Sequence, residues 1–142
     1  MNENEFDLHA AIEEAAARDP IIVRKFALAC ARHVQHLMAD PRSVRALNVA
    51  ERFLRGEASR TEIEEALKVA NTAQAAALAA RGPRVSSEDD HATHAAHAAT
   101  CAVYASYTAR VAYAAAYAAA YSALVGTAER EWQEDEFRRV VG

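Results

Sequence analysis

The alanine-rich stretch between Ser87 and Gly126 limits the fold of this chain more than any other feature. It contains neither glycine nor proline, the two residues that most often end a helix, and alanine has the highest helix propensity. A straight helix over this stretch would be about 60 Å long at ~1.5 Å per residue. A compact domain of 142 residues has a radius of gyration of only about 14–15 Å, so such a helix would extend beyond its neighbours.

Asp-Pro pairs and a few glycines divide the rest of the chain into helices. Aspartate is a preferred N-cap residue and proline is favoured at the first helical position, so Asp19-Pro20 and Asp40-Pro41 each start a helix. No strand-like alternation is present. The first three predicted helices run from about Phe6 to Ala17, from Pro20 to about Met38, and from Pro41 to Arg55, where Gly56 stops the helix. The fourth has its cap at Ser59 or Thr61 and ends before Gly82-Pro83. The fifth begins at Ser87, which forms a capping box with Asp90, and continues towards Gly126, after which a C-terminal helix begins.

Alanines recur at heptad spacing in the two long helices before Gly126. Steps of four and three residues keep one narrow stripe on one face, where small side chains let two helices approach closely. The short connection after Arg81 makes these helices antiparallel neighbours. The stripe consists of Ala66, Ala70, Ala73, Ala77 and Ala80 in one helix and of Ala95, Ala98, Ala102, Ala105, Ala109, Ala112, Ala116, Ala119 and Ala123 in the other.

These patterns predict one all-α domain over residues 1–142. It is a bundle of five to six helices in which a long alanine-rich helix packs antiparallel on the preceding helix. The preceding helix is about half as long and covers only the part from Asp90 to Arg110, so the tyrosine-bearing remainder is expected to overhang it. The expected support for that remainder is bulky apolar residues of the second and third helices, namely Phe26, Leu28, Val34, Leu37 and Val49.

Three tyrosines share one face of the alanine-rich helix, because Tyr113, Tyr117 and Tyr121 lie four residues apart. Tyrosine combines a large ring with a polar tip, which suits a boundary between core and solvent. One interpretation is that the rings pack on the first three helices and leave their hydroxyls at the surface. The other is a contact patch for a partner or for a second copy of the chain, since tyrosine is enriched in interface cores.

Charge and composition exclude several classes of function. The net charge of −4 does not favour binding to nucleic acids or anionic membranes. Between Ala92 and Val125, histidines, hydroxyls and Arg110 interrupt the apolar residues, and alanine contributes little to insertion into lipid, so no membrane span is expected. Two distant cysteines, and an acidic N-terminus without the apolar segment of a signal peptide, favour a cytoplasmic location.

A line of metal-capable side chains lies on the alanine-rich helix: Asp90, His94, His97 and Cys101. A line on one helix cannot surround an ion tetrahedrally, and zinc sites usually draw ligands from more than one element. We therefore expect no bound metal and no other cofactor. Cysteine–histidine pairs at helical spacing lack a third group to orient the histidine, so we also expect no enzymatic activity.

Arg42 and Trp132 stand out among the remaining residues. Arg42 lies in the first turn of its helix, where the helix dipole disfavours a cation unless it is paired. We expect it to pair with Asp40 or with an acidic residue from elsewhere, as an internal clamp between helices rather than a ligand contact. Trp132, the only tryptophan, lies in a highly charged C-terminal helix and is expected to anchor that helix to the core.

The segment FALACARHVQHLMADPRSVRALNVAERFLRGEAS, followed by the alanine-rich middle and EREWQEDEFRRVV, resembles the all-α immunity proteins of bacterial polymorphic toxin systems. The resemblance covers most of the chain from about Phe26 onward. That family carries an Asp-x-Arg motif and a tryptophan, which match Asp40, Arg42 and Trp132. Its members often repeat tryptophan among the alanines, where this chain has tyrosine and histidine. If those tryptophans contact the toxin, partner specificity has changed or that contact is absent.

The resemblance implies a cytoplasmic protein that binds a cognate protein toxin and neutralises it, with no chemistry of its own. The residues themselves leave an alternative open, a self-associating helical module that is structural or metal-responsive. The alanine stripe, the overhang and the line of histidines support this alternative. A toxin gene directly upstream would favour the first function.

Overall fold

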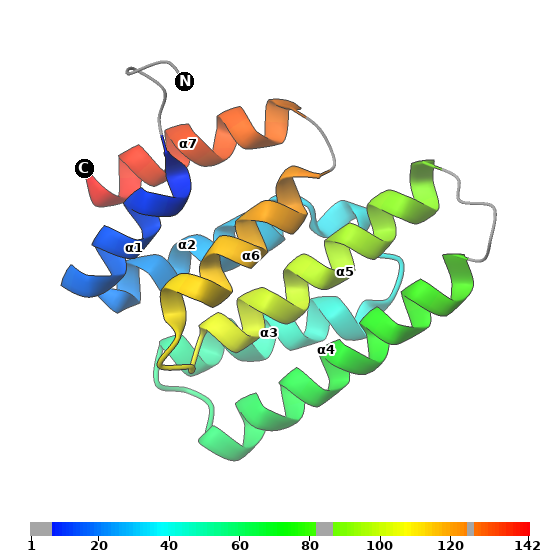
Figure 1. The fold of residues 1–142 in the computed structure, drawn as a ribbon. Helices are drawn as coiled ribbons and strands as arrows, with labels where there is room; N and C mark the ends of the chain where they lie inside the picture. Colours follow the sequence, from blue (N-terminus) through cyan, green and yellow to red (C-terminus); the bar gives the residue numbers. More distant parts are fainter. Residues whose placement is uncertain (1–6, 82–86, 125–126) are drawn as a thin grey trace.

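Figure 1 shows an all-α bundle in the computed structural model, which describes residues 7–81, 87–124 and 127–142. Within these residues the chain forms α-helices and one short 3-10 helix, and no strand is present. The all-α prediction is confirmed, although the described α-helices number seven rather than five or six. They are α1 (Leu8–Arg18), α2 (Pro20–His33), α3 (Pro41–Leu54), α4 (Arg60–Arg81), α5 (Ser87–Ala105), α6 (Val111–Ala123) and α7 (Thr127–Val141), with the 3-10 helix η1 (Gln35–Leu37) after α2.

Side-chain caps start the first four helices. Asp7, Asp19 and Asp40 each accept a backbone N–H of the first turn, at 3.1, 3.1 and 2.9 Å. Ser59 Oγ accepts the N–H of Glu62 at 3.1 Å, and the Glu62 carboxylate accepts the N–H of Ser59 at 3.2 Å, which is a capping box. The predicted caps at Asp19, Asp40 and Ser59 are therefore confirmed.

The other predicted helix boundaries either differ from the structure or lie outside the residues that it describes. Helix α2 ends at His33 rather than near Met38, because the chain tightens into η1. Helix α3 ends at Leu54, one residue before the predicted Arg55, which is its C-cap; the next residue is Gly56, whose φ of 76° favours glycine. The Gly82-Pro83 connection, the side chain of Ser87 and the break at Gly126 lie outside the described residues.

The predicted long helix is two helices, α5 and α6, because the chain turns back between them (Figure 1). The Ser106 hydroxyl donates to a carbonyl one turn back at 2.6 Å, and Thr108 Oγ1 accepts the N–H of Arg110 at 3.1 Å. The Arg24 guanidinium of α2 donates to the Ala105 carbonyl at 3.3 Å, which satisfies a carbonyl that the end of α5 leaves unpaired. The break needs neither glycine nor proline, because serine and threonine can hydrogen-bond their own backbone.

The tyrosine-bearing segment does not overhang its neighbours, which corrects the expectation drawn from helix lengths. After the turn, α6 runs antiparallel along α5 and also packs on α1, α2 and α7 (Figure 1). The expected support from α2 is present, whereas α3 packs mainly on α2, α4 and α5. The reversal lets α6 bury one face on the bundle instead of extending past it.

Helix α5 lies in the middle of the bundle, which explains its alanine content. It packs on α2, α3, α4 and α6, and none of its side chains from Asp90 to Ala105 is fully exposed. Small side chains let several neighbours approach one helix closely. In α5 the predicted stripe is buried at Ala95, Ala98, Ala102 and Ala105.

The predicted alanine stripe is kept only in part in α6, because the turn after α5 starts a new helix. Ala119 is buried as predicted, whereas Ala112, Ala116 and Ala123 are only partly buried and Ala109 is exposed. The face that α6 buries consists of Val111, Ala114, Ala115, Ala118, Ala119 and Ser122.

Helix α7 closes the bundle through contacts with α2 and α6. The Phe137 ring meets the Phe26 ring of α2 edge to face, with centroids 5.0 Å apart. The buried Gln133 donates from Nε2 to the Ala119 carbonyl of α6 at 2.9 Å. Helices α1 and α7 both pack on α6 and lie on one side of the bundle (Figure 1).

Candidate partner-binding surface

The outer side of α6 carries the three tyrosines of the predicted contact patch. Tyr113 and Tyr117 are 49% and 43% exposed, and Tyr121 is partly buried. Their rings form a row, with centroids 4.7 Å apart between Tyr113 and Tyr117 and 6.1 Å apart between Tyr117 and Tyr121. We call this surface the tyrosine face and define it as Arg110, Tyr113, Ala116, Tyr117, Ala120, Tyr121 and Leu124.

Contacts at both ends hold the row of rings in place. The Arg110 guanidinium lies 4.5 Å from the centroid of the Tyr113 ring, a cation–π contact. At the other end, Tyr121 stacks on His97 of α5, with centroids 4.5 Å apart and planes 15° from parallel. A side-chain hydrogen bond with Tyr113 is the largest cause that raises the pKa of Tyr117, so the two hydroxyls are linked along the row. Tyr121 therefore packs on the bundle, while Tyr113 and Tyr117 keep ring area free for contact.

Asp40 and Arg42 form a local ion pair at the start of α3. Arg42 Nη2 lies 2.7 Å from Asp40 Oδ2, and the Arg42 Nε and backbone N–H also donate to this carboxylate. The pair joins the cap to the first turn of the same helix, so it is not the expected clamp between helices. It lies beside a hollow of about 400 Å³ that is otherwise lined mainly by alanines of α4 and α5.

Removing the Asp40 cap should destabilise the protein in a pH-dependent way. Asp40→Ala is expected to lower the free energy of unfolding by about 1 kcal/mol at neutral pH, the usual value of an N-cap. Hydrogen bonds from the Arg42 side chain, and then from its backbone N–H, lower the pKa of Asp40. The charge-dependent part is therefore fully present above the pKa of about 3.9 of unfolded aspartate and is lost as pH falls through the lower folded-state pKa.

Urea unfolding of wild type and Asp40→Ala, from pH 7 down to about 2, tests this expectation. The difference between the two proteins should shrink at the acidic end. Arg42→Ala is the matched control, because it keeps the backbone N–H bond to Asp40 and should reduce only part of the pH dependence. If the unfolding free energies of wild type and Asp40→Ala differ by the same amount at all pH values, the charged Asp40 carboxylate does not contribute to stability as expected.

Of the four metal-capable side chains of α5, Asp90 and His94 contact each other, while His97 and Cys101 have other surroundings. Asp90 lies 3.4 Å from His94 and 3.5 Å from Arg81 of α4. His97 stacks on a tyrosine ring of α6, and burial raises the pKa of Cys101 to about 11, so its thiol is protonated at neutral pH. In the described parts of the chain, no group of three or more His, Cys, Asp and Glu side chains is arranged to hold a metal ion.

Trp132 takes part in a contact between α2 and α7 that sequence reasoning missed. Its indole stacks on the His33 imidazole, with centroids 3.7 Å apart and planes 4° from parallel. His33 Nδ1 lies 2.6 Å from a carboxylate oxygen of the buried Glu129. Trp132 therefore holds the start of α7 against the end of α2. No local pattern could pair His33 with Glu129, which is 96 positions away.

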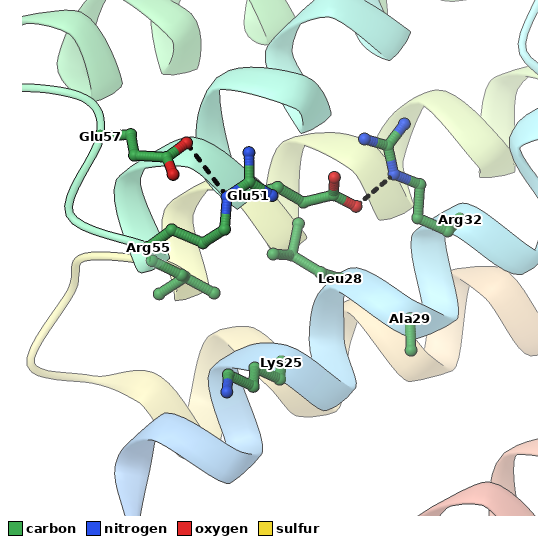
Figure 2. Close-up of a pocket in the computed structure, with 8 residues that line it drawn as sticks. Lys25, Leu28, Ala29, Arg32, Glu51, Arg55 and Glu57 are labelled. Atoms are coloured by element: carbon green, nitrogen blue, oxygen red, sulfur yellow. Dashed lines mark hydrogen bonds and ion pairs between the residues drawn. The ribbon is translucent and has the colours of Figure 1, made fainter.

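An open groove of about 770 Å³ lies between α2 and α3 (Figure 2). Arg32 Nε donates to Glu51 at 2.8 Å, and Arg55 Nε donates to Glu57 at 3.1 Å. These charges satisfy one another, so the tyrosine face is the better candidate for binding. The groove is lined by Lys25, Leu28, Ala29, Arg32, Glu51, Leu54, Arg55 and Glu57.

Comparison with known proteins assigns no family to this chain. No protein-family model, no curated protein and no solved structure matches it. Among the helices that the structure describes, none is long and apolar enough to cross a bilayer.

Proposed function

We propose that this protein is an immunity protein that binds a cognate bacterial toxin in the cytoplasm. It neutralises the toxin by steric occlusion and performs no catalysis. Asp40, Arg42 and Trp132 support this class, because they match the motif residues of the family that the sequence resembles. The observation that carries the proposal is the tyrosine face, where aromatic side chains remain exposed on a helix without any charged residue.

The chemistry of the tyrosine face suits a protein partner. Tyrosine and arginine are the residue types enriched among those that dominate binding energy, and charged groups are depleted from interface cores. Burying the Tyr117 ring under a partner brings no formal charge of the helix with it, and Arg110, which lies over the Tyr113 ring, can pair with a carboxylate of that partner. The contacts with Arg110 and His97 order the row in advance, which lowers the entropic cost of binding.

Co-expression with the toxin encoded beside the gene tests the proposal. The two proteins should co-purify, and growth should be restored in cells that produce the toxin. Tyr117→Ala is expected to raise the Kd at least tenfold, because an exposed ring at the centre of an interface is a typical hot spot. Leu78→Ala is the control, since Leu78 is similarly exposed, at 44%, but lies on α4.

Two results would count against different parts of the proposal. Equal toxin binding by wild type and Tyr117→Ala would show that the toxin does not bind at the tyrosine face. Absence of both binding and protection with the neighbouring gene product would reject the immunity function itself.

A further inference from the structure

The exposed residues of α6 and its C-cap follow a 4-3-4 spacing: Tyr113, Tyr117, Ala120 and Leu124. These positions lie within roughly 60° of one another on a helix with 3.6 residues per turn. The helix from Val111 to Ala123 contains no charged residue. A surface helix normally places charged and polar residues on its outer side, so α6 has the composition of a helix that is covered on both sides.

The order of large and small residues along this stripe is complementary to itself. If a second α6 lies antiparallel across a two-fold axis between Ala118 and Ala119, Tyr117 faces Ala120 of the second copy, and Tyr113 faces Leu124. The Tyr117 ring then opposes a small side chain, which lets the helices interdigitate near the axis, and Tyr113 packs on an apolar leucine at the ends. An isologous interface requires this kind of self-complementarity.

We propose that a second copy of this chain covers the tyrosine face through antiparallel packing of the two α6 helices. The inference rests on the proposed role of this face as a contact surface. In the dimer, the second copy covers the exposed tyrosine rings until the toxin binds. Small side chains at Ala116 and Ala120 let the two helices approach to roughly 8 Å. A toxin that binds more tightly displaces the second copy.

Charge supports the antiparallel direction. Arg110 carries the only formal charge of the tyrosine face. In the antiparallel pair the two copies of Arg110 lie about 25 Å apart along the helices, well beyond the Debye length of about 8 Å at physiological salt. A parallel pair would place them side by side and would also oppose tyrosine to tyrosine along the whole row.

The size of the surface sets the expected strength of the dimer. Helix α6 is about 20 Å long, and one face of such a helix offers less area than the ~800 Å² per partner of a stable interface. We therefore expect a reversible dimer with a micromolar or weaker Kd, which a more extensive toxin interface can displace.

Sedimentation equilibrium of the purified protein tests self-association without any toxin. Wild type should show a monomer–dimer equilibrium below about 1 mM. Tyr117→Arg should remain monomeric, because two arginines would meet beside the axis, while its melting temperature should change little at this exposed position. Leu78→Arg is the matched control on α4 and should dimerise as wild type does. Monomeric wild type, or an unchanged dimer of Tyr117→Arg, would overturn the proposal.

Disulfide cross-linking tests the direction of the helices. Under mild oxidation, a mixture of Tyr113→Cys and Leu124→Cys copies should form a cross-linked dimer, since these positions face each other. Tyr113→Cys alone should not, because its two copies lie about 16 Å apart, whereas a disulfide requires Cα atoms within ~7 Å. Wild type, which retains Cys30 and Cys101, shows the background. Efficient cross-linking of Tyr113→Cys with itself would indicate a parallel pair and overturn the proposal.

These experiments separate the dimer from the immunity function. A monomeric protein that binds and blocks its toxin would reject the dimer alone. A dimer with the predicted cross-link that neither binds nor blocks the neighbouring toxin would reject the immunity function alone.

Discussion

Phe137→Ala is expected to lower the free energy of unfolding by about 3–5 kcal/mol, the usual cost of removing a buried phenylalanine ring. Phe137 is 2% exposed and meets Phe26, which is 1% exposed, at a centroid distance of 5.0 Å and an interplanar angle of 77°. The substitution removes this edge-to-face contact and leaves a cavity where α7 meets α2. Because a domain is usually stable by only about 5–15 kcal/mol, the loss is a large fraction of the total.

Urea denaturation followed by circular dichroism measures this change. Phe53→Ala is a matched control, since Phe53 is only partly buried and its ring lies farther from its aromatic neighbour Tyr107, at 6.5 Å. Its loss should be clearly smaller. Similar losses for the two variants, or a loss below about 1 kcal/mol for Phe137→Ala, would show that α7 is not held through this contact.

Ala118→Leu should have the second-largest effect, a loss of about 1–3 kcal/mol or more. Ala118 is fully buried on the face of α6 that packs into the bundle. Leucine has nearly the same helix propensity as alanine, so the cost comes from the extra methyl groups that push α6 away from its neighbours.

The control for this substitution is Ala79→Leu, at an exposed position of α4. It makes the same chemical change without a packing conflict and should stay within about 0.5 kcal/mol of wild type. Thermal and urea unfolding of both variants give the comparison. If Ala118→Leu is as stable as Ala79→Leu, α6 does not pack closely on the bundle at Ala118.

Features that depend on a few neighbouring residues were predictable from the sequence. The caps at Asp19, Asp40 and Ser59 use side chains that bond N–H groups two or three residues away, so residue type and position suffice to locate them. The all-α class was also predictable, because the high alanine content favours helices and no strand-like alternation is present.

The break between α5 and α6 was only partly predictable from the sequence. Ser106 and Thr108 can bond their own backbone, and their proximity was a usable signal for a turn. The same residue types also occur inside helices, however: Thr100 donates to the Ala96 carbonyl within α5. The end of α5 also bonds to Arg24 of α2, a contact between residues 81 positions apart that no local pattern contains.

The candidate surface shows the same division between local and long-range causes. Spacing alone placed Tyr113, Tyr117 and Tyr121 on one face, because helical geometry is local. Which face α6 buries depended on the reversal of the chain, and a uniform run of alanines does not distinguish one side of a helix from another. Only the packed neighbours α1, α2, α5 and α7 decided that Tyr113 and Tyr117 remain at the surface, since burial is a property of the whole bundle.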